Sequence, residues 1–294
     1  MENRYERQLA EYATSVNDAL REQLRARGDC PQVVVLDAMR HSLLDAGKRI
    51  RGALVLEFGR LAGASREGAM ACACAVEMVH AYSLIHDDLP CMDNDDFRRG
   101  KPSCHRAFGE ATALLAGDAL LTQAFEVLAG APLPAQARVE AVSILAQAAG
   151  VYGMVGGQVL DLAAEEEPVD LAGLRQLCAL KTGALLRASA RLGCAAGGAS
   201  PALAAAADGY AAAYGLAFQI TDDILDVTGD AARLGKPVGS DRENHKSTHV
   251  SLLGLPEARR QAAELVDQAK RSLAGVADSG FLLWLADMVL TRDH

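Results

Sequence analysis

The sequence is poor in aromatic residues and in the residues that favour β-strands. Phenylalanine, tryptophan and tyrosine make up 4% of the 294 residues, and alanine and leucine supply most of the apolar content. This composition favours helices over strands. Hydrophobic residues nevertheless reach 50% of the chain, which is enough for a helical protein with a substantial core.

The sequence also has fewer basic residues than acidic ones. Lys and Arg total 29 against 38 Asp and Glu, which gives a net charge of −9. No long basic run offsets this balance, so nucleic acid is not an expected partner. The first residues are polar and acidic, which argues against a secretory signal, and no apolar run is long enough to span a bilayer. We therefore expect a cytoplasmic protein with no membrane span.

The cysteines form no CxxC pair and are odd in number. Most lie among alanine and leucine, so we expect reduced cysteines that serve as small core residues. The seven are Cys30, Cys72, Cys74, Cys91, Cys104, Cys178 and Cys194.

Apolar residues recur at helical spacing along nearly the whole chain. No segment rich in proline, glycine or serine separates two compact halves, so we expect a single all-α domain over residues 1–294. Two polar loops interrupt the pattern, at 90–109 and 228–246. The predicted helices cover 2–27, 32–45, 50–62, 66–88, 110–130, 134–153, 170–195 and 202–227, and two or three more follow from residue 247.

A cluster of aspartates stands at the end of the helix predicted over 66–88, in the segment HDDLPCMDNDDF. Carboxylates are unfavourable there, because the C-terminus of a helix already carries partial negative charge. A cation relieves the repulsion, and Mg²⁺ suits carboxylates together with water and phosphate oxygens. Pro90 ends the helix and allows Asp93 to fold back towards Asp87. The cluster consists of Asp87, Asp88, Asp93, Asp95 and Asp96.

A second cluster lies at the end of the helix predicted over 202–227, in FQITDDILDVTGD. Asp222 and Asp226 are one helical turn apart, as are Gln219 and Asp223. One such motif alone could be a solvated acidic loop. Two of them at matching helix ends, each followed by cations, favour a diphosphate held by metal ions and basic side chains. These cations are Arg98, Arg99 and Lys101 after the first cluster and Lys236 and Lys246 after the second.

A third basic group, GKRIR at 47–51, lies between two predicted helices. His80 stands seven residues before Asp87, so both project from the same face of one helix. A basic turn or a histidine in an apolar helix is weak evidence by itself, but the two together are consistent with a second anion-binding site.

The motifs together resemble the trans-isoprenyl diphosphate synthase family, most closely its bacterial short-chain farnesyl diphosphate synthases. The resemblance implies an orthogonal helical bundle of about ten or more helices around a central cavity, a homodimer, and condensation of isopentenyl diphosphate with an allylic diphosphate. The matching segments are GKRIR (47–51), EMVHAYSLIHDDLPCMDNDDFRRGKPSCH (77–105), FGEATALLAGDALL (108–121), GGQVLDL (156–162), KTGALLRAS (181–189), FQITDDILDVTGD (218–230) and LGKPVGSDRENHKST (234–248).

The resemblance also implies residue roles. Three Mg²⁺ ions would be held by Asp87, Asp88, Asp93, Asp222, Asp223 and Asp226. The allylic diphosphate would meet Arg98, Lys181, Lys236 and Lys246, and isopentenyl diphosphate would meet Lys48, Arg51, His80 and Arg99 without metal. Thr182 and Gln219, joined by Gln158, resemble the residues that line the carbocation.

Product length is expected to depend on the side chains one turn before Asp87, which are Tyr82 and Ser83. Bulky Tyr82 resembles the floor that stops bacterial farnesyl synthases at fifteen carbons. The two extra residues in DDLPCMD act in the same direction, but plant-type geranylgeranyl synthases share them. The sequence predicts farnesyl diphosphate, with geranylgeranyl diphosphate as the alternative.

Three features depart from the family pattern. Ala46 and Gly52 stand where a glycine and a proline are usual, and the tail TRDH has Arg292 as its one fixed positive charge. The first two put loop stiffness in doubt, and the third puts closure over the second substrate in doubt.

Three other classes compete with the synthase. A terpene cyclase needs no GKRIR site and normally has a different second metal motif. A non-catalytic subunit of a heteromeric synthase usually loses one aspartate motif, and this chain keeps both. A plain acidic metal-binding protein leaves the basic groups unexplained.

Overall fold

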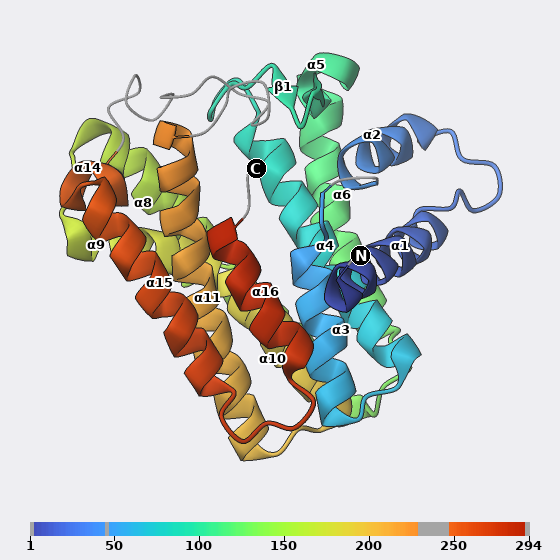
Figure 1. Ribbon diagram of the computed structural model, residues 1–294. Coiled ribbons are helices and arrows are strands. Elements are labelled where there is room, and N and C mark those ends of the chain that lie inside the picture. Colours follow the sequence, from blue (N-terminus) through green and yellow to red (C-terminus); the bar gives the residue numbers. More distant parts are fainter. Residues whose placement is uncertain (1–2, 45–46, 229–246, 292–294) are drawn as a thin grey trace.

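The computed structural model describes residues 3–44, 47–228 and 247–291. Helices account for most of the described chain, which confirms the all-α prediction (Figure 1). The elements are α1 (Arg4–Gln23), α2 (Val33–Leu43), α3 (Ile50–Ala62), α4 (Arg66–Asp87), β1 (Phe97–Arg98), β2 (Lys101–Pro102), α5 (Cys104–Phe108), α6 (Glu110–Ala129), α7 (Ala135–Ala149), α8 (Met154–Glu166), α9 (Leu171–Cys178), the π-helix η1 (Ala179–Gly183), α10 (Ala184–Gly197), α11 (Pro201–Thr228), α14 (His249–Leu253), α15 (Leu255–Ser272) and α16 (Gly280–Thr291).

Several helices begin and end at residues suited to capping. The side chain of Asn3 accepts a hydrogen bond from the Tyr5 amide, and Glu6 completes a capping box at the start of α1. Ser65 caps α4 by accepting from the Gly68 amide at 3.2 Å. Gly63, with φ of 79°, ends α3 in the left-handed conformation that glycine adopts without strain.

The two larger of four hydrophobic core clusters lie around α4 and α6 and around α11, α15 and α16. Helices α3 and α10 contribute residues to both clusters. Their backbones approach closely, because a Cβ on Gly193 would lie 2.4 Å from the Val55 carbonyl oxygen. Small residues thus give this chain, with its few aromatic rings, a tightly packed centre.

The cysteines match their predicted role. All seven are free thiols; Cys30 is half-buried, Cys91 is exposed, and the others are buried in the core: Cys72, Cys74, Cys104, Cys178 and Cys194.

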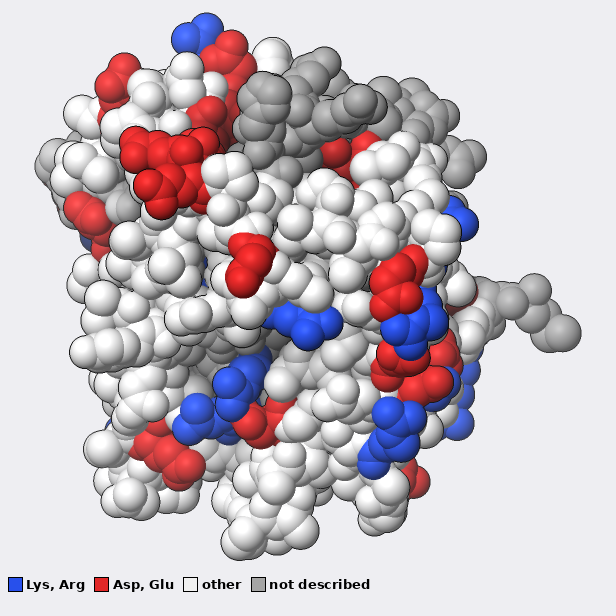
Figure 2. Space-filling model, turned by 90° about the vertical axis from the view of Figure 1, so that its left-hand side faces the viewer, with Lys and Arg blue, Asp and Glu red and all other residues white. Residues whose placement is uncertain are grey.

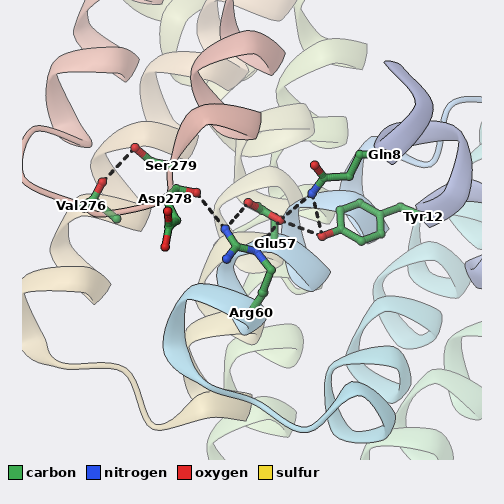
Figure 3. A network of polar contacts seen from close by, with 7 residues as sticks. All are labelled: Gln8, Tyr12, Glu57, Arg60, Val276, Asp278 and Ser279. Carbon is green, nitrogen blue, oxygen red and sulfur yellow. Dashed lines mark hydrogen bonds and ion pairs between the residues drawn. The ribbon is translucent and has the colours of Figure 1, made fainter. Parts of the chain in front are cut away.

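A buried carboxylate ties α1 to α3 and to the segment before α16 (Figure 3). Glu57 has 1% of its side chain exposed and accepts a 2.7 Å hydrogen bond from the Tyr12 hydroxyl and a 3.2 Å bond from Gln8. Arg60 donates to Glu57 at 2.8 Å and also to the backbone carbonyl of Asp278 at 2.8 Å. These partners offset the cost of placing a charge inside the protein.

Some elements differ from the sequence prediction. The helix predicted to end at residue 153 ends at Ala149, and a separate helix, α8, follows Gly153. The helix predicted over 170–195 is divided by η1. The loop predicted over 90–109 contains α5 and a β-hairpin, whose two-residue turn, Arg99–Gly100, has positive φ at both positions (53° and 74°). Such turns match the natural twist of paired strands.

The expectation that no segment reaches the length of a membrane span is wrong by length and composition alone. Three helical stretches are long and apolar enough: Arg66–Asp87, Glu110–Ala129 and Ala135–Glu166. In α4, 72% of the most apolar window is buried inside the protein, but the shares for the other two are 39% and 33%. The apolar residues of α4 are therefore used in the core, whereas α6, α7 and α8 leave apolar residues exposed.

Candidate functional site

The first aspartate cluster begins on the last residue of α4, Asp87. The chain turns back immediately after the helix, because the Asp93 amide donates a 2.9 Å hydrogen bond to the Asp87 carbonyl and the Met92 amide donates to the Leu89 carbonyl. This turn confirms the prediction that the chain reverses after Pro90. Figure 1 shows that α4 and α11 end at the same end of the molecule, so the two aspartate motifs lie at one end of the bundle.

Burial raises the pKa of Asp87 to about 6. The nearby charge of Lys181 opposes the shift, and the carboxylate of Asp93 adds to it. Burial also raises the pKa of Asp88, although the hydrogen bond from Arg98 lowers it. Carboxylates that are costly to ionise and lie close together are a local excess of negative charge, which a bound cation would relieve.

Asp88 is buried and its carboxylate is occupied by Arg98. The Arg98 Nε donates to both oxygens, at 2.7 and 2.9 Å, and Nη2 lies 2.6 Å from Oδ1. Arg98 is thereby fixed at the end of α4, where it was expected to meet a diphosphate. The metal-ligand role of Asp88 stays a prediction.

The next residue, Arg99, points elsewhere. Its guanidinium lies against Gly47, with Cζ 3.4 Å from the place that a Cβ would occupy. The hairpin turn between β1 and β2 therefore directs two adjacent arginines to two places, one at the aspartates and the other beside the GKRIR segment.

Arg51, His80 and Arg99 form a positively charged group. Burial, together with the charges of Arg51 and Arg99, holds the pKa of His80 well below its usual value. Burial also lowers the pKa of Arg51, and its Nε is enclosed without a hydrogen-bond partner among the described residues. Arg51 and His80 keep part of their surface accessible although they lie deep between helices, as residues that line an internal cavity do. An anion bound there would satisfy this group.

The GKRIR segment is held by a buried ion pair. Arg49 has φ of 53°, and its guanidinium donates to Glu77 at 3.0 Å, to Asn17 at 2.7 Å and to the Leu43 carbonyl. The other oxygen of Glu77 accepts from the Gly52 amide at 2.9 Å. A proline at position 52 would have no amide hydrogen to make this bond. The glycine found here in place of the usual proline therefore allows a backbone hydrogen bond that fixes the segment to Glu77.

Lys181 lies in the π-helix and is paired with a residue that we did not predict. Its Nζ donates a 2.5 Å hydrogen bond to Oδ2 of Asp161 on α8. The two elements touch through Gly157, where a Cβ would lie 2.1 Å from the Lys181 amide nitrogen. π-Helical turns are frequent at functional sites because they displace a few residues from the regular helical positions.

A cavity of about 150 Å³ brings together three residues that the resemblance had grouped. Lys181, Thr182 and Gln219 line it, with Asp161 and Asp223 among their neighbours. The amide nitrogen of Gln158, Nε2, is buried and has no hydrogen-bond partner within the described part of the chain. Gln158 is not among the residues that line this cavity, but an unsatisfied buried donor is consistent with a ligand-binding role.

The three aspartates of the second motif differ in their surroundings. Oδ2 of Asp223 accepts two hydrogen bonds from His249, at 2.7 Å from the amide and 2.8 Å from Nδ1. The negative charge of Asp222 partly opposes the lowering of the Arg51 pKa by burial. Asp222 is therefore close to Arg51, and the second motif faces the basic group. Asp226 is buried. The metal-ligand role of Asp223 stays a prediction, because its oxygen anchors the start of α14.

The remaining predicted residues are not all at this site. Lys48 lines a separate cavity of about 500 Å³ between α1 and α16, with Glu6 and Asp287. Tyr82 is buried on α4, and the Ser83 hydroxyl donates to the His80 carbonyl of its own helix at 2.9 Å. Ala46, Lys236, Lys246 and Arg292 lie outside the described residues.

Sequence reasoning missed Asp161, His249 and Glu77. The GGQVLDL segment contains Asp161 and could have drawn attention to it, because a lone acid in an apolar helix needs a partner. Nothing in the sequence pairs His249 with Asp223 or Glu77 with Arg49, because each contact joins residues more than twenty positions apart.

Comparison with known proteins identifies the family. Residues 32–278 match the family described as polyprenyl synthetase. The chain belongs to the polyprenyl synthetase family. It is 49% identical to a farnesyl diphosphate synthase of Escherichia coli over 271 residues, covering 88% of this chain and 89% of the relative.

Two further relatives extend the comparison within the polyprenyl synthetases. A chloroplastic geranylgeranyl pyrophosphate synthase of Capsicum annuum is 45% identical over 291 residues, covering 97% of this chain and 78% of the relative. The crystal structure of an FPP/GFPP synthase from Zymomonas mobilis superposes with a TM-score of 0.87 at 40% identity, covering 97% of this chain and 98% of the other. The helical-bundle fold and the family resemblance seen in the sequence are thus confirmed.

The donor set fits a hard divalent cation. The described residues contain no group of three His, Cys, Asp or Glu side chains already gathered as a metal cage. Mg²⁺ does not need one, because it usually keeps several waters and binds one or two carboxylates together with substrate phosphates. Asp87 supplies a carboxylate whose charged form is costly without a cation.

Proposed function

We propose that this polyprenyl synthetase is a farnesyl diphosphate synthase. It joins isopentenyl diphosphate head-to-tail to dimethylallyl or geranyl diphosphate and releases diphosphate. The observation that carries this proposal is the pairing of two distinct anion sites at one end of the bundle. One combines carboxylates with Arg98 and Lys181, and the other combines Arg51, His80 and Arg99.

The two sites suit two different diphosphates. Asp87, Asp93, Asp222 and Asp226 would hold Mg²⁺ for the allylic diphosphate. Asp88 and Asp223, which the resemblance also predicts as ligands, contact Arg98 and His249. The basic group around His80 takes isopentenyl diphosphate without metal, because it already supplies positive charge. Lys48, Lys236 and Lys246 remain diphosphate contacts that the family resemblance alone predicts, because Lys48 lines a separate cavity and the other two lie outside the described residues.

In the reaction, Asp88 and Asp161 keep Arg98 and Lys181 in position, and the remaining N–H groups of these two cations donate to the allylic diphosphate. Mg²⁺, when bound by the aspartates, would supply further positive charge to stabilise the diphosphate as the allylic C–O bond breaks. The bond's electron pair goes to the leaving oxygen. Thr182 and Gln219 direct oxygen dipoles at the allylic cation, and the apolar helices exclude water that would capture it.

The second substrate then forms the new bond. Arg51, His80 and Arg99 hold isopentenyl diphosphate so that its double bond lies next to the cation and attacks it. The new C–C bond leaves a cation on the isopentenyl part, and the released diphosphate takes the proton whose loss restores a double bond. The product is an allylic diphosphate five carbons longer.

The product is assigned to fifteen carbons because Tyr82 is buried one turn below Asp87. Its side chain has 6% of its surface exposed, and burial raises the pKa of its phenol to about 12, so the ring remains a neutral, bulky obstacle. A relative named as a geranylgeranyl synthase covers most of this chain, which keeps twenty carbons as the alternative.

We further propose a cytoplasmic homodimer that carries no membrane span and binds no nucleic acid. Figure 2 shows Lys and Arg in separate small groups beside acidic residues on the described part of one face. The apolar residues exposed on α6, α7 and α8 supply a surface that a second copy would cover. They include Leu114, Leu115, Val139, Val155 and Val159, and Val151 and Tyr152 are exposed between α7 and α8.

Product analysis tests the proposed function. Purified protein is incubated with Mg²⁺, isopentenyl diphosphate and, in separate tubes, dimethylallyl, geranyl or farnesyl diphosphate, and the dephosphorylated products are sized by gas chromatography. We expect a fifteen-carbon product from both shorter starters and no extension of the longest. A twenty-carbon product would support the alternative, and no condensation by folded protein would overturn the enzyme assignment.

A further inference from the structure

The ring of Tyr82 does not stand alone on α4. One helical turn later, His86 projects from the same face, and the two ring centroids are 5.7 Å apart with the planes at 78°. This is the edge-to-face arrangement that aromatic pairs prefer. The imidazole therefore limits how far the phenol can move on the side towards the end of α4.

His86 is itself fixed by the neighbouring helix. Its Nε2 lies 3.1 Å from the carbonyl oxygen of Leu114 on α6 and 3.9 Å from Oδ1 of Asp118. A carbonyl oxygen only accepts, so Nε2 carries the hydrogen and donates it to α6.

Gly117 makes the room for this imidazole. A Cβ at position 117 would lie 2.1 Å from Nε2 of His86, 2.4 Å from Cδ2 and 3.0 Å from Cε1. No side chain larger than hydrogen can share that space. Glycine in the interior of a helix is less favourable than alanine. Gly117 therefore makes α6 less stable as a helix at the position where the His86 ring contacts it.

We infer that His86, seated on Gly117, is a positioning residue that holds Tyr82 as the floor of the product cavity and thereby sets product length. The inference rests on the proposed function and adds two residues to it. The contacts form one continuous path from the backbone of α6 through the imidazole to the phenol. Because the path joins α4 to α6 just before Asp87, it also fixes the floor relative to the first aspartate.

Product length is the decisive readout, because loss of packing alone would lower stability without changing it. We compare the purified full-length protein with the variants His86→Ala and Gly117→Ala, using geranyl diphosphate, isopentenyl diphosphate and Mg²⁺. In both variants the imidazole no longer supports Tyr82, so the ratio of twenty- to fifteen-carbon product should rise by roughly fivefold, the size expected from one aromatic edge contact. Gly209→Ala, a glycine inside α11 whose Cβ would meet only the Ser272 side chain, serves as the control and should leave the ratio unchanged.

Thermal unfolding of the double variant tests the contact itself. Gly117→Ala should lower Tm in the native background, because the new methyl group displaces the imidazole. The same change should raise Tm when His86 is already alanine, because the clash is gone and alanine favours the helix. This reversal of sign is measurable even if a variant is inactive.

The possible failures are distinguishable. If the unchanged protein condenses no substrate, the proposed function fails, whatever the Tm values show. If it makes the fifteen-carbon product and both variants make it in the same ratio, the positioning role of His86 is overturned. A Gly117→Ala change that lowers Tm equally in both backgrounds would overturn the packing on which the inference depends.

Discussion

Lys181 and Asp161 are joined by a 2.5 Å hydrogen bond that links the π-helix to α8. The lysine is one of the cations assigned to the allylic diphosphate, and its partner keeps it at the cavity wall before substrate binds. Arg98 and Asp88 repeat the arrangement at the end of α4. In both pairs a buried or half-buried carboxylate holds a cation in position for an incoming anion.

Asp161→Asn should impair the reaction more than stability. The loss of a charge-assisted hydrogen bond costs about 1.5–3 kcal/mol, which corresponds to about ten- to a hundredfold in kcat/KM for the allylic substrate. Asp208→Asn is the matched control, because Asp208 also holds a cation, Arg187, but at the surface. Equal activity of the two variants in a steady-state assay would contradict the positioning role of Asp161.

The aspartates of the second motif should separate into two classes. Asp222→Asn should lower kcat by more than about a hundredfold, because it removes a ligand that acts on the transition state. Asp223→Asn should lower Tm by loosening His249, and should leave the Mg²⁺ concentration for half-maximal activity nearly unchanged. Magnesium titrations of both variants check this. A shift of the Mg²⁺ dependence in Asp223→Asn would show instead that Asp223 is a metal ligand.

The ionisation of Asp87 should make the metal-free protein less stable as the pH rises. Burial raises the pKa of Asp87 from 3.8 to about 6, so the folded state keeps a proton that the unfolded state has lost. Stability from this group is greatest below the unfolded pKa and falls as the pH passes through about 4 to 6. About two pKa units correspond to about 3 kcal/mol.

Asp87→Asn removes this dependence. In a chelator, the variant should exceed the native protein in free energy of unfolding by up to about 3 kcal/mol at pH 7.5, and the gap should close near pH 4. Urea denaturation at the two pH values measures both. A gap of the same size at pH 4 would show that the ionised carboxylate is not its cause.

The carboxylate network in Figure 3 should contribute to stability through the Tyr12 hydroxyl. Tyr12→Phe removes one partner of buried Glu57 and should lower the free energy of unfolding by about 1–2 kcal/mol. Tyr5→Phe on the same helix is the control, because that hydroxyl packs against Gly280. Its effect should stay within about 0.5 kcal/mol. Equal losses in the two variants, measured by urea denaturation, would remove Tyr12 from the network.

Local sequence patterns were sufficient for most of the helices and for the first aspartate turn. The spacing of apolar residues located α3 and α4 within a residue at each end, and Pro90 was enough to predict that the chain turns back after Asp87. These features depend on neighbours in the chain, so a single sequence contains their causes.

The features that were missed depend on contacts between distant segments. The π-helix that contains Lys181 looks like an ordinary helix in sequence, and it is stabilised where Gly157 lets α8 touch it. Helix α8 was missed altogether, because the predicted helix over 134–153 was followed by no other before residue 170. The orientation of Arg98 and Arg99 depends on a hairpin of two-residue strands, too short for a period to be recognised.

The central claim is that the ends of α4 and α11 form one catalytic site. The most direct test measures the rate of diphosphate release by three variants: Asp87→Asn, Asp222→Asn and the double variant. Residues that act as a unit are not additive: removing either one costs about as much as removing both. We predict that each single variant is as slow as the double variant, and that none of them has a Tm below that of the native protein. Single variants that remain active, or losses that multiply in the double variant, would contradict a shared site.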